Sequence, residues 1–242
     1  MPSKRVRIRE AKKNAVAIFI VIAFAAVVFS VNSIGKFIAQ KVISPIAQTG
    51  TTKAQTVSFS LNEVTFFAVG ETCEKKDAVV TAGGAGFDFN ENVLFSCYTT
   101  KEQAELVAQK HALLILPLSA DKLSVKLTGA SEQILPIKDG INLLQEALIE
   151  TLDTSALLEQ ADITRTQAKA KAELNLNNLN QALSNIKESN NETITQLRLS
   201  LQCYVTAFSL LDDTQSTNFL TSYKTLCCTL LHEYLSFASA ID

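Results

Sequence analysis

The chain contains one long, uncharged and mainly apolar run, from Ala15 to Ile34. Six basic residues and one acidic residue precede it within residues 1–14, whereas the first charges behind it are only Lys36 and Lys41. In a helix, about 20 residues reach across a hydrocarbon core of roughly 30 Å. Because the more basic flank stays on the inner side of a membrane, the pattern predicts a cytoplasmic tail over residues 1–14 and a transmembrane helix over residues 15–35.

The alternatives for this run are a cleaved signal peptide and a buried core helix. A signal peptide has a shorter apolar region, on the order of 7–15 residues, and a small-x-small cleavage site, which Phe29–Ser33 matches poorly. A core helix this apolar would be unusual directly behind six basic residues. We therefore expect an uncleaved anchor in the lipid bilayer, with the N-terminus cytoplasmic and the chain after Lys36 extracytoplasmic.

A strand pattern follows an extended linker over residues 36–55. Apolar and polar side chains alternate from Val57 to Leu61, and the strand pattern continues to Gly70. Further along we expect a helix over residues 74–82 and strands over residues 87–89 and 93–98. A second helix, capped by Thr99 or Thr100 and with one face marked by Ala104, Val107, Ala108 and His111, comes before closing strand material over residues 113–118 and 123–127. This order predicts an α+β domain over residues 56–128 of the split β-α-β-β-α-β, ferredoxin-like type.

Helical patterns replace the strand pattern from Ser131 onward. Apolar residues recur at helical spacing, and Asn190-Asn191 and Asp212–Thr214 read as turns. The pattern predicts a long helix over residues 154–188, preceded by a shorter helix and followed by two more. Long amphipathic helices joined by short polar turns predict an all-α antiparallel hairpin or bundle over residues 131–242, with coiled-coil-like apolar stripes that face a core or a partner.

The charge balance restricts the partners of the exported region. The 242-residue chain has 22 basic and 24 acidic residues, and without residues 1–14 the balance is 16 to 23. An acidic exported region disfavours nucleic acid and anionic wall polymers as electrostatic partners. The basic tail, by contrast, suits the anionic inner leaflet of a membrane.

The five cysteines have no CxxC spacing. In an oxidising compartment Cys73 and Cys97 are a conceivable pair if their strands are neighbours. Cys227 and Cys228 are adjacent and cannot both face the same side of a helix. Together with Cys203, these residues are more simply explained as small apolar side chains.

No recognisable catalytic constellation appears, and we predict a protein that is not an enzyme and holds no cofactor or metal. The two histidines, His111 and His232, lie in separate predicted modules, and neither has a second ligand at metal spacing. The glycines of residues 83–86 lack the full GxGxxG spacing and are expected to form a turn. Four carboxylates in one region read as solvated loop charges: Glu71, Asp77, Asp88 and Glu91.

The stretch Val64–Gln109 resembles the SPOR family of cell-envelope domains. The resemblance is carried by the segments FFAVGETCEKKDA, GGAGF and VLFSCYTTKEQAELVAQ, in which a strand closes into a short turn and a helix opens with charged residues and Ala. The glycine step of the second segment is similar to that in members from Gram-positive bacteria. The resemblance covers about residues 57–128 and leaves the helical region unmatched.

The resemblance implies that the exposed face of the sheet binds bare peptidoglycan glycan strands, in cell division or sporulation. The positions it indicates for glycan contacts are Phe66, Glu71, Asn90, Asn92 and Ser96. Aromatic rings stack on sugar rings, and amide and hydroxyl groups hydrogen-bond their hydroxyls.

The chain departs from the family pattern at several of these positions. Ala68 stands where many members have Gln, Asn90 and Asn92 stand where Trp and Arg are common, and the chain has no Trp. The alternative hypothesis is therefore an envelope scaffold that binds no glycan. In that case the C-terminal helices recruit another envelope protein or self-associate.

Overall fold

The computed structural model describes residues 55–129, 131–212 and 218–241. The predicted cytoplasmic tail and transmembrane helix lie outside the described residues, as does the linker up to residue 54. Within the described part, none of the helices combines the length and the apolarity that a membrane span requires.

The fold is α+β, as predicted, with six α-helices and two small sheets in the described residues. The predicted β-α-β-β-α-β order is present between Val64 and Ala120. Its elements are β2 (Val64–Thr72), a 3₁₀ turn with α2 (Cys73–Lys75 and Lys76–Thr81), β3 (Phe87–Phe89), β4 (Asn92–Tyr98), α3 (Lys101–His111) and β5 (Leu114–Ala120). The four strands form an antiparallel sheet in the order β3-β4-β2-β5.

The prediction of one continuous strand from Val57 to Gly70 was wrong. The chain forms two strands instead, β1 (Gln55–Ser60) and β2, separated by Leu61–Glu63. β1 pairs with β6 (Ser124–Gly129) in a separate two-stranded ribbon, in which Val57 lies opposite Leu127. The strand partner changes at this point: Leu61 N–H still bonds Leu123 O at the end of the β1–β6 pairing, whereas Val64 pairs with Ala120 of β5, and the exposed Asn62 and Glu63 lie between.

Local sequence signals explain two features of the four-stranded sheet. Thr100 caps α3, as predicted, because its side chain accepts a hydrogen bond from the backbone N–H of Gln103. Gly70 lies at a β-bulge opposite Leu94, where a Cβ atom would be 2.5 Å from Val93 O. No side chain fits there without moving the neighbouring strand, so the bulge requires glycine.

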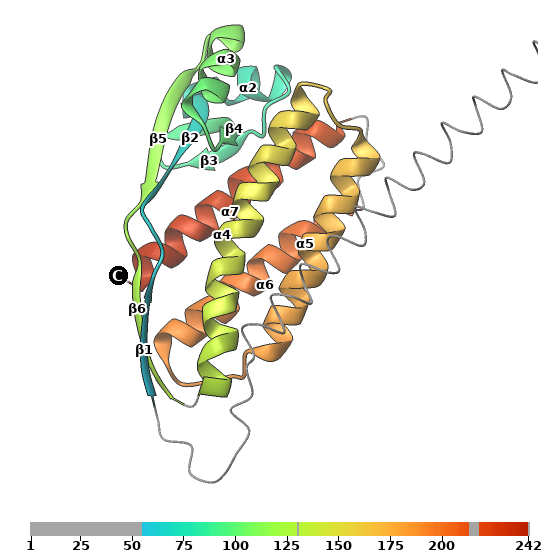
Figure 1. Cartoon of the computed structure of the whole chain (residues 1–242). Coiled ribbons are helices and arrows are strands. Elements are labelled where there is room, and N and C mark those ends of the chain that lie inside the picture. The colour runs from blue at the N-terminus through green and yellow to red at the C-terminus, as the bar shows by residue number, and fades with distance from the viewer. Residues whose placement is uncertain (1–54, 130, 213–217, 242) are drawn as a thin grey trace, which may run out of the picture. The chain divides into compact units, whose positions relative to one another are not determined.

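Four helices follow the strands, and consecutive helices run in opposite directions (Figure 1). They are α4 (Ser131–Glu159), α5 (Arg165–Asn185), α6 (Glu192–Asp212) and α7 (Phe219–Ala240). Their predicted apolar stripes are mostly buried, including Ile141, Leu148, Leu201, Tyr204 and Tyr234. The antiparallel bundle predicted for this region is thus present.

The predicted long helix over residues 154–188 was wrong, because the chain turns between α4 and α5. Ala161 has a left-handed φ of 61°, which ends α4. Thr164 then caps α5 in a capping box, in which Thr164 and Gln167 each bond the other's backbone N–H.

The four-stranded sheet is covered on both faces, and its strands lie along one flank of the bundle (Figure 1). On the inner face, which we define as the face toward α7, Phe66, Leu94 and Cys97 join the core of the helical bundle. On the outer face, Val69 and Phe95 pack with residues of α2, α3 and the end of α4, and Lys224 near the start of α7 also reaches the Phe95 ring. The sheet and the bundle therefore share a core.

Candidate functional site

Phe66, the aromatic residue predicted to contact glycan, lies on the inner face under α7. It has no exposed surface, and its ring meets Tyr234 of α7 edge to face at 6.1 Å between centroids. Ala68 and Cys97 on the same face have no exposed surface either. The chain's own helix thus occupies this surface of the sheet, and Phe66 is unable to touch a polymer in this conformation.

The other predicted residues are dispersed. Ser96 is fully buried. Glu71 is nearly buried, and its carboxylate accepts hydrogen bonds from Lys75 Nζ at 2.8 Å and from the backbone N–H of Thr72 at 3.0 Å. The hydrogen bond from Lys75 is the main cause that lowers the pKa of Glu71. Asn90 lies in the exposed β3–β4 turn with a φ of 54°, and the half-buried Asn92 begins β4.

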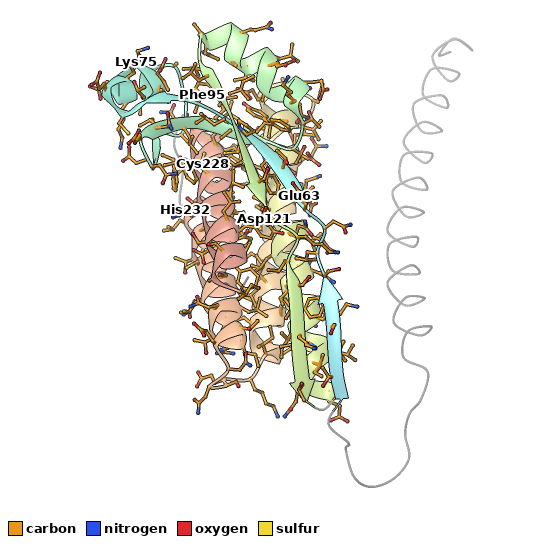
Figure 2. All side chains as sticks on the ribbon, turned by 90° about the vertical axis from the view of Figure 1, so that its left-hand side faces the viewer. Glu63, Lys75, Phe95, Asp121, Cys228 and His232 are labelled. Atoms are coloured by element: carbon orange, nitrogen blue, oxygen red, sulfur yellow. The ribbon has the colours of Figure 1, made fainter. Side chains whose placement is uncertain are left out.

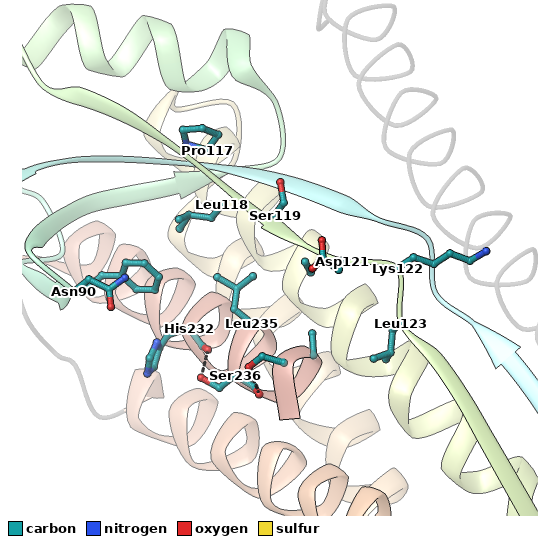
Figure 3. Close-up of a pocket in the computed structure, with 14 residues that line it drawn as sticks. Asn90, Pro117, Leu118, Ser119, Asp121, Lys122, Leu123, His232, Leu235 and Ser236 are labelled. Atoms are coloured by element: carbon teal, nitrogen blue, oxygen red, sulfur yellow. Dashed lines mark hydrogen bonds between the residues drawn. The ribbon is translucent and has the colours of Figure 1, made fainter. Parts of the chain in front are cut away.

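A groove next to Asn90 contains one of the predicted residues. It has a volume of about 500 Å³ and lies between the β3–β4 turn, the end of β5 and the C-terminal half of α7 (Figure 3). We call it the sheet–α7 groove. Its apolar lining includes Phe89, Leu118 and Leu235, and its polar side chains include Asn90, Asp121, Lys122, His232, Ser236 and Ser239. The Ser119 hydroxyl lies on the other face of β5, where it is hydrogen-bonded to Thr65 Oγ1.

The sheet–α7 groove offers hydrogen-bonding groups beside aromatic rings. His232 packs edge to face on Phe89 at 5.8 Å between centroids and also contacts Phe87. Ser236 Oγ donates to His232 O, so the hydroxyl retains only its acceptor capacity for a ligand. Neutral polar ligands such as sugars suit this combination. Within the described residues no three His, Cys, Asp or Glu side chains gather as a metal site would require.

A second groove, of about 440 Å³, runs between α6 and α7, and its surface is mainly apolar although threonines, His232 and Glu233 also line it. We call it the α6–α7 groove. Ala207, Leu211 and Leu226 lie within it, and Leu210 on its rim is 67% exposed. His232 belongs to the linings of both grooves, which therefore flank α7 on two sides.

A buried ion pair joins α7 to α4 and the sheet. Lys224 of α7 has a side chain only 3% exposed, and its Nζ lies 2.8 Å from a carboxylate oxygen of Glu159. Tyr98 of β4 donates its O–H to the same carboxylate at 2.8 Å, and Lys224 Nζ lies 3.8 Å from the centroid of the Phe95 ring. Burial lowers the pKa of Lys224, and the ion pair with Glu159 opposes this shift.

Helix α7 also binds the glycine-rich segment of residues 83–86. Gly83 O accepts hydrogen bonds from Lys224 Nζ and Thr221 Oγ1, and Ala85 O accepts one from Thr225 Oγ1. These contacts give the glycine-rich segment a structural role, because α7 packs on it. Lys224 was not among the predicted site residues, although a lysine within an apolar helical stripe is a recognisable signal.

The cysteine pair considered from the sequence is not brought together. Cys73 is exposed near Asn90 O, whereas Cys97 is buried with its Sγ 3.6 Å from Cys228 Sγ. Cys227 and Cys228 face different neighbours, as expected, since Cys227 Sγ contacts Thr151 O.

Comparisons of the chain with models of known protein families, with characterised proteins and with solved structures found no significant match.

Proposed function

We propose that the protein is a membrane-anchored cell-envelope scaffold that performs no catalysis. Residues 15–35 anchor it, the extracytoplasmic region begins after Lys36, and the helical bundle makes its protein contacts. The observation that carries this proposal is the burial of the inner face of the sheet under α7, with Phe66 at 0% exposure. A SPOR-like sheet with this face closed serves as a platform for the bundle.

Opening the inner face of the sheet would cost a large amount of free energy. Lifting α7 from the sheet would expose Phe66 and Leu94 together with Leu230 and Tyr234, all fully or nearly fully buried. Each large apolar side chain that leaves the core costs about 1.5–3 kcal/mol. It would also separate Lys224 from Glu159 in a nearly dry environment. A ligand that required the inner face would have to compensate all these losses.

The α6–α7 groove supports self-association as the scaffold's contact. Leu210 protrudes from the rim of a groove that has room for an apolar side chain. Leu199, about three turns earlier on the same side of α6, is 51% exposed. In a twofold dimer the same patch of each copy contacts the other copy, so the patch needs both a protruding side chain and a groove that receives one. A second copy of this chain meets that requirement, because the Leu210 side chain of each copy can enter the groove of the other.

Sedimentation equilibrium of the compact unit Thr52–Asp242 tests this association. We expect a monomer–dimer equilibrium that L210E weakens by about tenfold or more, because a charge would enter an apolar contact. The matched control is L106E on α3, where the native leucine is equally exposed but lies outside both grooves. A unit that stays monomeric at every concentration, or equal effects of both variants, would contradict self-association through this groove.

Glycan binding is the second candidate function, and the sheet–α7 groove is the observation that favours it. The resemblance to SPOR domains predicts a glycan partner, and this groove combines the exposed Asn90 with the Phe89 ring and the imidazole of His232. A glycan strand there would lie beside α7, and the sheet would stay covered.

Co-sedimentation with amidase-treated and untreated peptidoglycan sacculi tests this candidate. We expect retention to rise on the denuded glycan and to fall about two- to tenfold in N90G, which removes the amide and tolerates the positive φ. N62A is the control, because Asn62 is exposed and lies outside the groove. If the native unit were retained on neither preparation, glycan binding would be rejected and the scaffold function would be the remaining proposal.

A further inference from the structure

Two buried thiols connect the sheet to α7. Cys97 Sγ on the inner face of β4 lies 3.6 Å from Cys228 Sγ on α7, and 131 positions separate the two residues in the chain. Cys97 is 0% exposed and Cys228 is 1% exposed. Figure 2 shows Cys228 along α7, below the strands that cover the helix. Both side chains lie in the core, and their sulfur atoms are already in contact, so a disulfide requires them to come about 1.5 Å closer.

The neighbouring cysteines provide an internal comparison. Cys227 is equally buried, but its Sγ points to Thr151 O at 3.7 Å. Cys73 and Cys203 are exposed. Of the five cysteines, Cys97 and Cys228 have the thiol-to-thiol contact that the structure records.

We propose that Cys97 and Cys228 form a disulfide when the chain folds in an oxidising compartment, and that this bond ties α7 to the inner face of the sheet. The extracytoplasmic address belongs to the proposed function, whereas the pairing itself depends only on the fold. The oxidant is a small-molecule or protein disulfide, such as oxidised glutathione.

The reaction is a double thiol–disulfide exchange. The thiolate of one cysteine attacks a sulfur of oxidised glutathione, which forms a mixed disulfide and releases one glutathione thiolate. The second cysteine thiolate attacks the protein sulfur of the mixed disulfide and releases the second glutathione. The two cysteine sulfurs lose two electrons, glutathione disulfide gains them, and the two thiol protons end on the two released glutathiones.

Because both thiols are buried in the folded protein, the reaction has to begin during folding. The hydrogen bond with Cys228 and desolvation raise the pKa of the Cys97 thiol, so the folded protein contains little of the attacking thiolate. An oxidant also has no path to a side chain without exposed surface. The first exchange therefore takes place before α7 docks on the sheet, and packing then brings the second thiol to the mixed disulfide.

The test is refolding of the full-length chain from denaturant in detergent with a glutathione redox buffer, followed by peptide mapping without reduction. We expect a cross-linked pair of peptides carrying Cys97 and Cys228, and an intact mass lower by two hydrogen atoms. C227A and the double variant C73S/C203S are the matched controls and should keep the link, whereas C97A and C228A should lose it. Oxidant added to the folded, reduced protein should form the link much more slowly.

Thermal unfolding adds a second measurement on the native sequence. Because the bond closes a loop of 131 positions, the oxidised protein should unfold about 5–10 °C above the reduced protein. Free Cys97 and Cys228 thiols in a correctly refolded, oxidised sample would overturn the proposal, as would a link from Cys97 to Cys73 or Cys227. These outcomes are independent of dimerisation and of sacculus binding, which are measured separately.

Discussion

Lys224 is the residue whose environment departs most from its type, since a lysine is rarely buried without a partner. The carboxylate of Glu159 and the face of the Phe95 ring replace the water that its ammonium group loses. One carboxylate thus serves α7 through Lys224 and β4 through Tyr98. A single side chain of α4 therefore holds three elements together.

We predict that E159Q destabilises the protein by about 3 kcal/mol, because the charge on Lys224 stays buried without an opposite charge. Gln has the same size as Glu and can still accept the hydrogen bond from Tyr98. The loss of unfolding free energy therefore measures the effect of the charge. Urea unfolding monitored by circular dichroism measures it.

The control for this prediction is E105Q. Glu105 pairs with Lys101 on the surface of α3 at 3.1 Å, and both side chains are well exposed. Such pairs contribute about 0–1 kcal/mol. Equal losses in the two variants would contradict the assigned role of Glu159.

At the scale of elements, the helix break between α4 and α5 was available in the sequence but was not recognised. Thr164 and Gln167 have the spacing of a capping box, and Asp162 precedes them. The apolar periodicity continues across this segment with Leu158 and Ile163, which pack against the same core. Periodicity alone therefore suggested one helix, because both helices face the shared core.

The β1–β6 ribbon could not be predicted in the same way. Alternation correctly indicated strands at Val57–Phe59 and Leu123–Leu127, but it contains no information about pairing partners. The inward side chains of both strands, including Val125 and Leu127, pack in the core that α4 contributes to. The long helix α4 provides the surface on which the ribbon lies, and this surface exists only in the folded chain.

At the scale of the whole molecule, the sheet has two apolar faces and needs a layer on each. α2 and α3 cover the outer face, and α7 covers the inner one. The nearly continuous apolar run from Val64 to Gly70 is typical of a strand buried on both faces. That signal conflicts with an open ligand-binding face, and it could have been recognised from the sequence.

The four tyrosines of the chain predict how stability depends on pH. All four are buried, and burial raises the pKa of each, to about 12 for Tyr234. The unfolded tyrosines ionise near pH 10, so above about pH 10 the folded state binds more protons. Unfolding free energy should therefore fall with rising pH, by up to about 1.4 kcal/mol per pH unit for each tyrosine.

Two other kinds of buried group modify this dependence. The lowered pKa of Lys224 acts in the opposite direction, since the unfolded lysine binds the extra proton. The raised pKa values of Cys97 and Cys227 act in the same direction as the tyrosines. Four tyrosines outweigh one lysine, so the net slope is negative.

Urea unfolding at about pH 9 and about pH 11, together with the ultraviolet absorbance of tyrosinate, checks this prediction. Tyrosinate should appear only as the protein unfolds. Ionisation of the folded protein near pH 10 would show that the tyrosines are accessible and would contradict the shared core.

The sequence by itself determined the local elements, because alternation, helical spacing and caps act over a few residues. It indicated the α+β class, most strands, the Thr100 cap and the apolar faces of the helices. The tertiary structure alone decided that α7 covers the inner face, that Glu159 neutralises Lys224, and that Cys97 meets Cys228. These contacts join residues 65 or more positions apart, such as Glu159 and Lys224 or Cys97 and Cys228. No local pattern records which of several apolar faces will meet, since burial is non-directional and the pairing follows from the packing of the whole chain.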